Sequence, residues 1–305
     1  MGENGGFSLL SLDGVGEAAK LLIEKIANAV GWLATRDTPK KMALNAYIED
    51  IKKSNYDPII KASLISNAAK TIKEYSCQRE ILNHALKNMK DTAKPNEVDD
   101  DWIIQFMDKA SRVSNAEFQL IWGKVLSEEC NKPGTMPRRL LHILEQMDKK
   151  DAELFTRICS FTVHYYQNEI IGYLPIIPIS MRVSSVDTRE QNRSFFREKG
   201  LDYSAIKHLT SIGLVENDLY GITGGYHVEF ITPPPNTIYY FENSITFPAE
   251  IIRVPTSNVA LTRAGIALCH AIQAEEQIDF WEKICLPLWD EKSLREYNSP
   301  ERIPT

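Results

Sequence analysis

The chain has 305 residues, of which 43% are hydrophobic and 25% charged, and its formal net charge is −6. This balance is typical of a globular protein with enough apolar material for a core, and the length suggests about two domains. The negative charge argues against a protein that coats nucleic acid or anionic membranes through bulk charge, although a local basic face stays open.

The five cysteines are an odd number, are widely spaced and contain no CxxC pair. We therefore expect reduced, buried thiols in a cytoplasmic protein and no disulfide framework. No signal peptide is expected, because Glu3 stands where such a peptide has a basic start. The apolar stretch 15–33 approaches membrane-spanning length but carries charges such as Glu17 and Lys25. This pattern predicts an amphipathic helix and no transmembrane segment.

The N-terminal half of the chain has the spacing of a helical protein. Residues 1–14 are rich in glycine and are expected to be flexible. Apolar residues three and four positions apart then predict six or seven helices up to residue 166. Thr38-Pro39 and Asp57-Pro58 each place a capping residue before a proline at the first helical position, which marks two helix starts. Lys94-Pro95-Asn96 interrupts the pattern after the second of these helices.

Asp99, Asp100 and Asp101 precede the next predicted helix. Three consecutive carboxylates invite a metal-site interpretation, but neighbours at a helix start diverge by about 100° each and do not converge on one ion. Negative side chains in a first turn cap free N–H groups and suit the helix dipole. We therefore predict a helix cap here and no metal.

The clearest pattern in the chain lies between Asn115 and Phe155. It contains one apolar stripe from 118 to 126 and a second from 140 to 147, separated by the break at 131–137. Two amphipathic helices joined by a short Pro/Gly turn fold back on each other to bury such stripes. We expect this hairpin to be the core of an N-terminal helical domain over residues 15–166.

The pattern changes after Tyr166. A last helix of the first domain is expected to begin at Asp148 and to reach Val163, and the polar tail 291–305 is expected to fray. Between residues 166 and 291, segments with the three-and-four spacing of helices alternate with segments that resemble strands. Short helices are predicted at 188–199, 201–212, 258–272 and 278–288, and extended or strand-like segments at 170–181, 226–231, 237–241 and 245–254.

The order of these segments resembles a winged-helix domain. A helix ends at Ile212-Gly213-Leu214-Val215, strand-like segments follow, and Leu261 to Gly265 matches the LTxxG start of a closing helix. The region 215–259 is longer than a simple wing and must hold extra strands. The predicted fold is therefore α+β but mainly α, with an N-terminal helical bundle followed by a winged-helix-like α/β domain over residues 167–290.

The segment from Asp99 to Phe155 also resembles an uncharacterised family of bacterial proteins that is defined only as a domain of unknown function. Most of residues 96–160 follow the family pattern, with Met136-Pro137 departing from it where serine is frequent. The resemblance implies an association with prophages and with defence or abortive-infection neighbourhoods, and no activity. The matching positions are Trp102, Phe106, Ala110, Val113, Ser114, Trp122, Leu126, Glu128 or Glu129, Pro133, Gly134, Arg138 or Arg139, Leu140, Leu144, Asp151 and Phe155.

The sequence contains little that indicates catalysis. Residues 14–19 match GxGxxA, but a dinucleotide site needs a strand–helix–strand unit and the following chain is helical. A P-loop, a GxSxG nucleophile elbow and an HExxH motif are absent, and the six histidines are scattered. We expect no cofactor and no metal, while a catalytic triad that assembles only in three dimensions stays open.

One basic pattern could serve as a binding site. Arg189, Arg193 and Arg197 are four residues apart, so a helix would place three guanidinium groups on one face, near Arg182, Lys199 and Lys207. Alternatively, this is a solvated face balanced by Asp187, Glu190 and Glu198. A second basic candidate is Arg138 with Arg139, whose position at a helix start is unfavourable for the dipole and suggests an acidic or phosphate partner.

Two functions of different classes follow from these observations. The first is a non-enzymatic interaction or regulatory protein of the bacterial cytoplasm, in which the N-terminal helices bind a partner protein or a second copy. The alternative is a nucleic-acid-binding protein that uses the winged-helix-like region and the arginines on phosphates. A third hypothesis is an unrecognised hydrolase or nuclease.

Overall fold

The computed structural model describes residues 16–30, 37–167, 170–178, 186–217, 226–230, 236–251, 253–272, 274–290 and 294. The chain divides into two compact units, Met1–Glu145 and Gln146–Thr305. We describe each unit by itself. This division falls before the boundary expected at residue 166, because the helix that follows Asp148 packs within the second unit.

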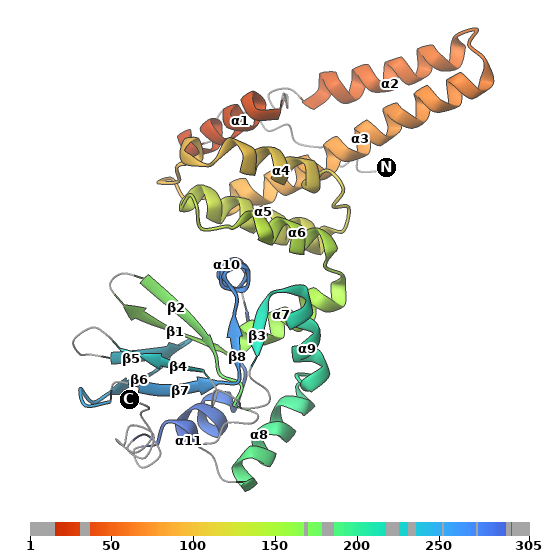
Figure 1. Ribbon diagram of the computed structural model, residues 1–305. Helices are drawn as coiled ribbons and strands as arrows, with labels where there is room; N and C mark the ends of the chain where they lie inside the picture. The colour runs from red at the N-terminus through yellow and green to blue at the C-terminus, as the bar shows by residue number, and fades with distance from the viewer. Residues whose placement is uncertain are drawn as a thin grey trace, which may run out of the picture. The chain divides into compact units, whose positions relative to one another are not determined.

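The described part of the first unit is helical (Figure 1). Its helices begin where the sequence supplies a cap: the side chain of Asp57 accepts the N–H of Ile59, and that of Asn115 accepts the N–H of Phe118. The elements are α1 (Glu17–Val30), α2 (Asp37–Lys53), α3 (Pro58–Asn88), the short 3₁₀-helix η1 (Pro95–Glu97), α4 (Asp100–Ala110), α5 (Ala116–Asn131) and α6 (Arg138–Gln146).

The three consecutive aspartates cap and anchor α4. Asp99 is the N-cap, and its carboxylate accepts the N–H of Trp102 at 2.8 Å. Asp100 forms an ion pair with Lys25 of α1, whereas Asp101 lies 3.4 Å from the guanidinium of Arg138. Asp99 also contacts Arg138, so Asp99 and Asp101 share one cation while Asp100 points to Lys25, and the three carboxylates do not converge on one point.

The core of the first unit lies where α3, α4 and α5 meet. Trp102 stacks on Phe106, and Phe106 in turn contacts Trp122, with ring centroids about 5 Å apart in both pairs. Gly123 permits the close approach of α5 to α3, because a Cβ there would lie 2.4 Å from the Cβ of His84. The apolar residues predicted on α5 and α6 are mostly buried, although Leu120 is 40% exposed. The main partner of α5 is α3 and not α6, so the expected packing of α5 on α6 is not the centre of this core.

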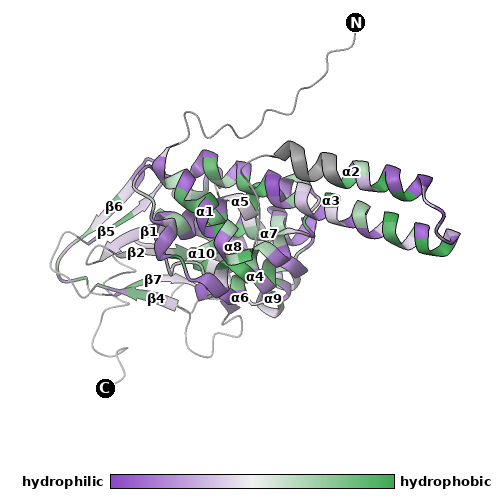
Figure 2. Ribbon diagram, turned by 90° about the horizontal axis from the view of Figure 1, so that it is seen from above, coloured by the Kyte–Doolittle hydropathy of each residue, from purple (hydrophilic) through white to green (hydrophobic). Residues whose placement is uncertain are grey.

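The outer parts of α2 and α3 form a helical arm that extends beyond the other helices of the first unit (Figures 1 and 2). We define the arm as residues 44–75. In this arm the two helices pack against each other, and Ile51 and Ala68 are among the few buried side chains. The arm therefore has a thin core, which contrasts with the three-helix packing at the other end of α3.

The second unit combines helices with three small antiparallel sheets. Its helices are α7 (Lys149–Ser160), α8 (Val186–Glu198), α9 (Tyr203–Ile212), α10 (Arg263–Ala271), the π-helical turn η2 (Trp281–Cys285) and α11 (Leu286–Leu288). Its strands are β1 (Thr162–Gln167), β2 (Ile170–Pro175), β3 (Val215–Asn217), β4 (Tyr226–Glu229), β5 (Asn236–Tyr240), β6 (Asn243–Phe247), β7 (Arg253–Ser257) and β8 (Val259–Leu261).

The largest sheet has the order β2-β1-β5-β6, and β4 pairs with β7 in a separate ribbon. Val163, which we expected to end the preceding helix, lies instead in β1 and is fully buried. The helix ends at Ser160 because the next residues, Thr162 to Tyr166, are β-branched or aromatic and pair along the whole of β2. Phe161, between helix and strand, contacts Phe196 and Phe280 in the core.

The segment that ends α9 is tied to the start of α10. Gly213 caps α9 in the left-handed conformation with φ 90°, and β3 then pairs with β8. Thr262 caps α10, and its hydroxyl donates to the carbonyl of Gly213 at 2.7 Å. Gly265 lies so close that a Cβ there would be 2.0 Å from the carbonyl oxygen of Leu214.

The structure confirms a mainly α, α+β fold, with the strands confined to the C-terminal part of the described chain. Among the described helices, none combines the length and the apolar character needed to cross a membrane.

Candidate functional site

The predicted arginine stripe lies on α8, where two of its three arginines share one carboxylate. Arg193 and Arg197 both approach the carboxylate of Glu190, at 3.7 and 3.4 Å. Arg189 is half-buried, and its buried Nε has no hydrogen-bond partner in the described part of the chain. Arg182 lies outside the described residues. The stripe is therefore a partly neutralised helix face, close to the solvated alternative considered from the sequence.

The two lysines of the same prediction do not extend the stripe into a continuous surface. The ammonium of Lys199 lies 5.9 Å from the ring centre of Phe195. The main-chain carbonyl of Lys199 accepts a hydrogen bond from Arg157. Lys207 is exposed on α9. The structure thus brings Arg193 and Arg197 together around Glu190 and leaves the lysines as separate charges.

Arg138, the second basic candidate, has an acidic partner within its own unit. Its guanidinium donates to Asp99 at 2.6 Å and to Asp101 at 3.4 Å. The Arg138 hydrogen bond, helped by the N–H of Trp102, holds the pKa of Asp99 below its ordinary value. These contacts account for the unfavourable dipole position of Arg138 without an external anion. Arg139, its neighbour, is exposed.

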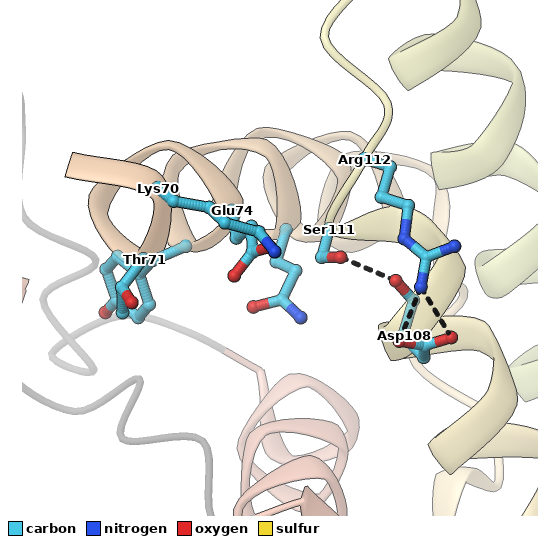
Figure 3. A pocket seen from close by; sticks show the side chains of 8 residues that line it. Lys70, Thr71, Glu74, Asp108, Ser111 and Arg112 are labelled. Atoms are coloured by element: carbon cyan, nitrogen blue, oxygen red, sulfur yellow. Dashed lines mark hydrogen bonds and ion pairs between the residues drawn. The ribbon is translucent and has the colours of Figure 1, made fainter. Parts of the chain in front are cut away.

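A hollow of about 480 Å³ lies between α3 and the end of α4 (Figure 3). Its charged side chains pair with one another: Lys70 with Glu74 at 3.7 Å, and Arg112 with Asp108 at 3.3 Å. Arg112 also reaches Glu145 at 3.2 Å. Since these charges are matched locally, we interpret the hollow as a solvated groove between helices rather than as a ligand site.

An aromatic cluster covers one face of the β2-β1-β5-β6 sheet. Cross-strand register places His164 of β1 opposite Tyr173 of β2 on one side and opposite Tyr239 of β5 on the other. The rings of His164 and Tyr239 are stacked, 5.4 Å apart and inclined by 18°. Tyr166 is roughly perpendicular to both and is 56% exposed. Tyr173 also contacts His270 of α10. We call His164, Tyr166, Tyr173, Tyr239 and His270 the aromatic band.

Strand alternation explains why these rings share a face. Residues 164 and 166 point to one side of β1, whereas Val163 and Tyr165 point to the other. There the ring of Tyr165 lies over Gly172, where a Cβ would be only 2.1 Å from it. Sequence reasoning missed the band, although the consecutive aromatic residues in TVHYYQ and NTIYY were a usable signal.

The groups that could support catalysis are mostly engaged. Burial raises the pKa of Cys77, Cys159 and Cys285, and raises that of Cys130 to about 12, so these thiols are held protonated. His208 Nε2 lies 2.6 Å from Asp151, which also forms a capping box with Asp148 at the start of α7. Within the described residues, no three His, Cys, Asp or Glu side chains are grouped to hold a metal ion.

The structure defines a two-unit, mainly α protein whose second unit carries an aromatic sheet face. The chain belongs to the DUF2806 family, described as proteins of unknown function, whose profile matches residues 69–285. The match begins within α3, so the outer part of the arm precedes it. Comparison with curated proteins and with solved structures gave no match.

Proposed function

We propose that this protein is a non-enzymatic interaction protein that assembles with a second copy of itself through its N-terminal helices. The observation that supports this proposal most directly is the arm, residues 44–75, which carries large apolar side chains in contact with solvent. A role associated with prophages or defence belongs to the same proposal and depends on the family resemblance alone.

The tip of the arm is unusually apolar for a solvent-exposed helix end. Tyr47, Tyr56 and Ile60 are 46%, 54% and 51% exposed, and Ile59 is 80% exposed. Scattered exposed apolar residues are ordinary, but here they gather where α2 meets α3, and three of them lie within Tyr56 to Ile60. The arm therefore offers apolar surface that a partner could bury.

A second copy of the arm suits this surface. A pair of antiparallel helices with little core of its own gains most from packing on another such pair, because four helices enclose a common core. The arm contains five lysines and four carboxylates, so its net charge is +1 and two copies repel each other little. A twofold arrangement would place the same patch of both copies in contact.

The test is the oligomeric state of the full chain, measured by sedimentation velocity over a range of micromolar concentrations. We expect the wild type to dimerise and Ile59→Glu/Ile60→Glu to weaken the dimer at least tenfold. Ile278→Glu is the matched control, since Ile278 is 83% exposed in the second unit. A wild type that stays monomeric throughout, or a dimer that the arm variant leaves unchanged, would overturn the proposal.

A second candidate function is nucleic-acid binding by the second unit as a winged-helix-like module. It is favoured by the order α8, α9, β3, β8 and α10, in which Thr262 ties the start of α10 to the end of α9. The strands β4 to β7 would then be an insertion between the two strands of the wing. The arginines of α8 would contact phosphates after leaving Glu190.

Salt-dependent binding of duplex and single-stranded DNA tests this second candidate. Arg193→Glu/Arg197→Glu should abolish binding and flatten its salt dependence, whereas Glu190→Gln should strengthen binding because it frees both guanidinium groups. Leaving Arg189 intact avoids disturbing its half-buried side chain. DNA affinity that neither variant changes would remove the arginines from the interface.

A further inference from the structure

We propose that the aromatic band binds a proline-rich segment in the polyproline II conformation. This would be a second interaction surface, on a different unit from the arm, and it does not depend on the proposed self-assembly. The five rings come from three adjacent strands and α10, so they form a continuous strip rather than isolated surface aromatics.

The face is almost free of charge, which selects the class of ligand. Among its described strand positions, the neighbours of the rings are threonine, serine, isoleucine and proline, and none is Asp, Glu, Lys or Arg. Burial lowers the pKa of His164, so its imidazole is neutral at pH 7. A polyanion such as single-stranded nucleic acid needs cations beside its stacked bases, and this face has none among the described positions.

Hydrogen-bonding groups accompany the rings. In the described part of the chain, no hydrogen bond engages the hydroxyl of Tyr166 or Tyr239. A polyproline II helix makes no internal hydrogen bonds, so its carbonyl groups are available to such donors. Stacked aromatic side chains with hydroxyl donors are the surface on which proline-rich segments dock.

The spacing of the strands matches the repeat of this ligand. Tyr173 and Tyr239 lie on either side of His164, so they are two strand spacings apart, or about 9.6 Å. A polyproline II helix repeats every three residues, or about 9.3 Å. A segment that crosses the strands would therefore place equivalent proline rings beside Tyr173 and Tyr239, with His164 between them.

Decaproline labelled with fluorescein tests the proposal by fluorescence anisotropy with the full-length protein, against a Gly-Ser peptide of equal length. We expect decaproline to bind and the Gly-Ser peptide not to bind. Tyr166→Ala and Tyr239→Ala should each weaken binding at least tenfold. Tyr203→Ala, which removes a 45% exposed tyrosine from α9, should change it less than twofold.

Two further measurements separate a docking role from a structural one. Thermal unfolding should show that Tyr166→Ala is folded, because this side chain is more than half exposed. Binding should change less than about twofold between about 0.05 and 0.5 M salt, since no ion pair is involved. Absence of decaproline binding, or binding that both tyrosine variants retain, would overturn the proposal. Binding of oligothymidine or cellohexaose without binding of decaproline would also overturn it.

Discussion

The buried carboxylate of Glu129 accepts the main-chain N–H of Met136 at 2.7 Å, and its other oxygen accepts the N–H of Gly134 at the same distance. The indole of Trp102 donates to the carbonyl of Met136 at 2.8 Å. The backbone of Met136 is thus held on both sides, by one side chain of α5 and one of α4. The proline and glycine of the sequence locate the turn between α5 and α6. The side chain that organises this turn is Glu129, two residues before the end of α5.

Replacing Glu129 with alanine should destabilise the first unit by about 2–4 kcal/mol. The change leaves the buried N–H of Met136 and the partly buried N–H of Gly134 without an acceptor and opens a small cavity. Urea unfolding measures the loss, and Glu128→Ala, which alters the adjacent and more exposed carboxylate, should cost less than about 1 kcal/mol. Equal losses in the two variants would show that the turn does not depend on Glu129.

Gly123→Ala should also destabilise the first unit, although alanine is the better helix former. The added methyl would meet the Cβ of His84 at 2.4 Å and the backbone of Ala85 at 3.0 Å, so α3 and α5 would have to separate. We expect a loss of about 1–3 kcal/mol in urea unfolding, as for overpacked cores. Leu120→Ala, at an exposed position of the same helix, is the control and should be nearly neutral. A more stable Gly123→Ala would mean that the helix contact is looser than described.

The N-terminal helices were predictable because their signals are local. Asp57-Pro58 and Asn115 lie beside the backbone groups that they cap, and the stripe on α5 needs only the spacing of its own residues. The sheet was harder to predict from the sequence, because β1 pairs with β5 more than 70 residues away, as in the pair His164 and Tyr239. Val163 fits the helical spacing of α7 and the alternation of β1 equally well, and its pairing opposite Leu174 of β2 decides between them.

The candidate sites divide in the same way. The arginine spacing on α8 was visible in the sequence, and so was Glu190, but no spacing rule says that one carboxylate approaches both Arg193 and Arg197. The aromatic runs were visible in the sequence, but their assembly into the aromatic band was not, because the rings converge from β1, β2, β5 and α10. The exposure of Ile59 and Tyr56 likewise depends on where the other helices of the first unit end.

Acid should weaken the first unit partly through Asp99. Its carboxyl has a folded pKa below the ordinary value of 3.8, chiefly because of the Arg138 hydrogen bond. Such a group stabilises the folded state above its unfolded pKa, and this contribution is lost as the pH falls through the folded pKa. In Arg138→Gln the pKa should return towards 3.8. The stability difference from wild type should then be constant above about pH 5 and should shrink as the pH falls below about 4.

Arg139→Gln is the matched control for this pH dependence. It removes the same charge one residue away, and its stability difference from wild type should be nearly the same at pH 6 and pH 3. Unfolding free energies from urea titrations at several pH values test both variants. A difference for Arg138→Gln that stays constant down to pH 2 would show that the Asp99 ion pair contributes nothing to folding. Added salt should reduce the effect, because both side chains are exposed.

Thr262 joins the start of α10 to the end of α9, and we expect the hydrogen bonds of its hydroxyl to stabilise this contact. The hydroxyl accepts the N–H of Gly265 at 3.0 Å and donates to the carbonyl of Gly213 at 2.7 Å. Thr262→Val keeps the shape but loses both bonds, so it should destabilise the second unit by about 1–3 kcal/mol. Thr262→Ser retains the hydroxyl and should cost less than about 1 kcal/mol.

Hydrogen exchange locates this effect better than global unfolding does. In Thr262→Val, faster exchange is expected first at the start of α10 and at β3 and β8, which Thr262 adjoins. The β2-β1-β5-β6 sheet, whose pairing does not involve Thr262, should keep its protection. If Thr262→Val keeps the wild-type protection at these sites, the hydrogen bonds of the hydroxyl do not hold α9 to α10.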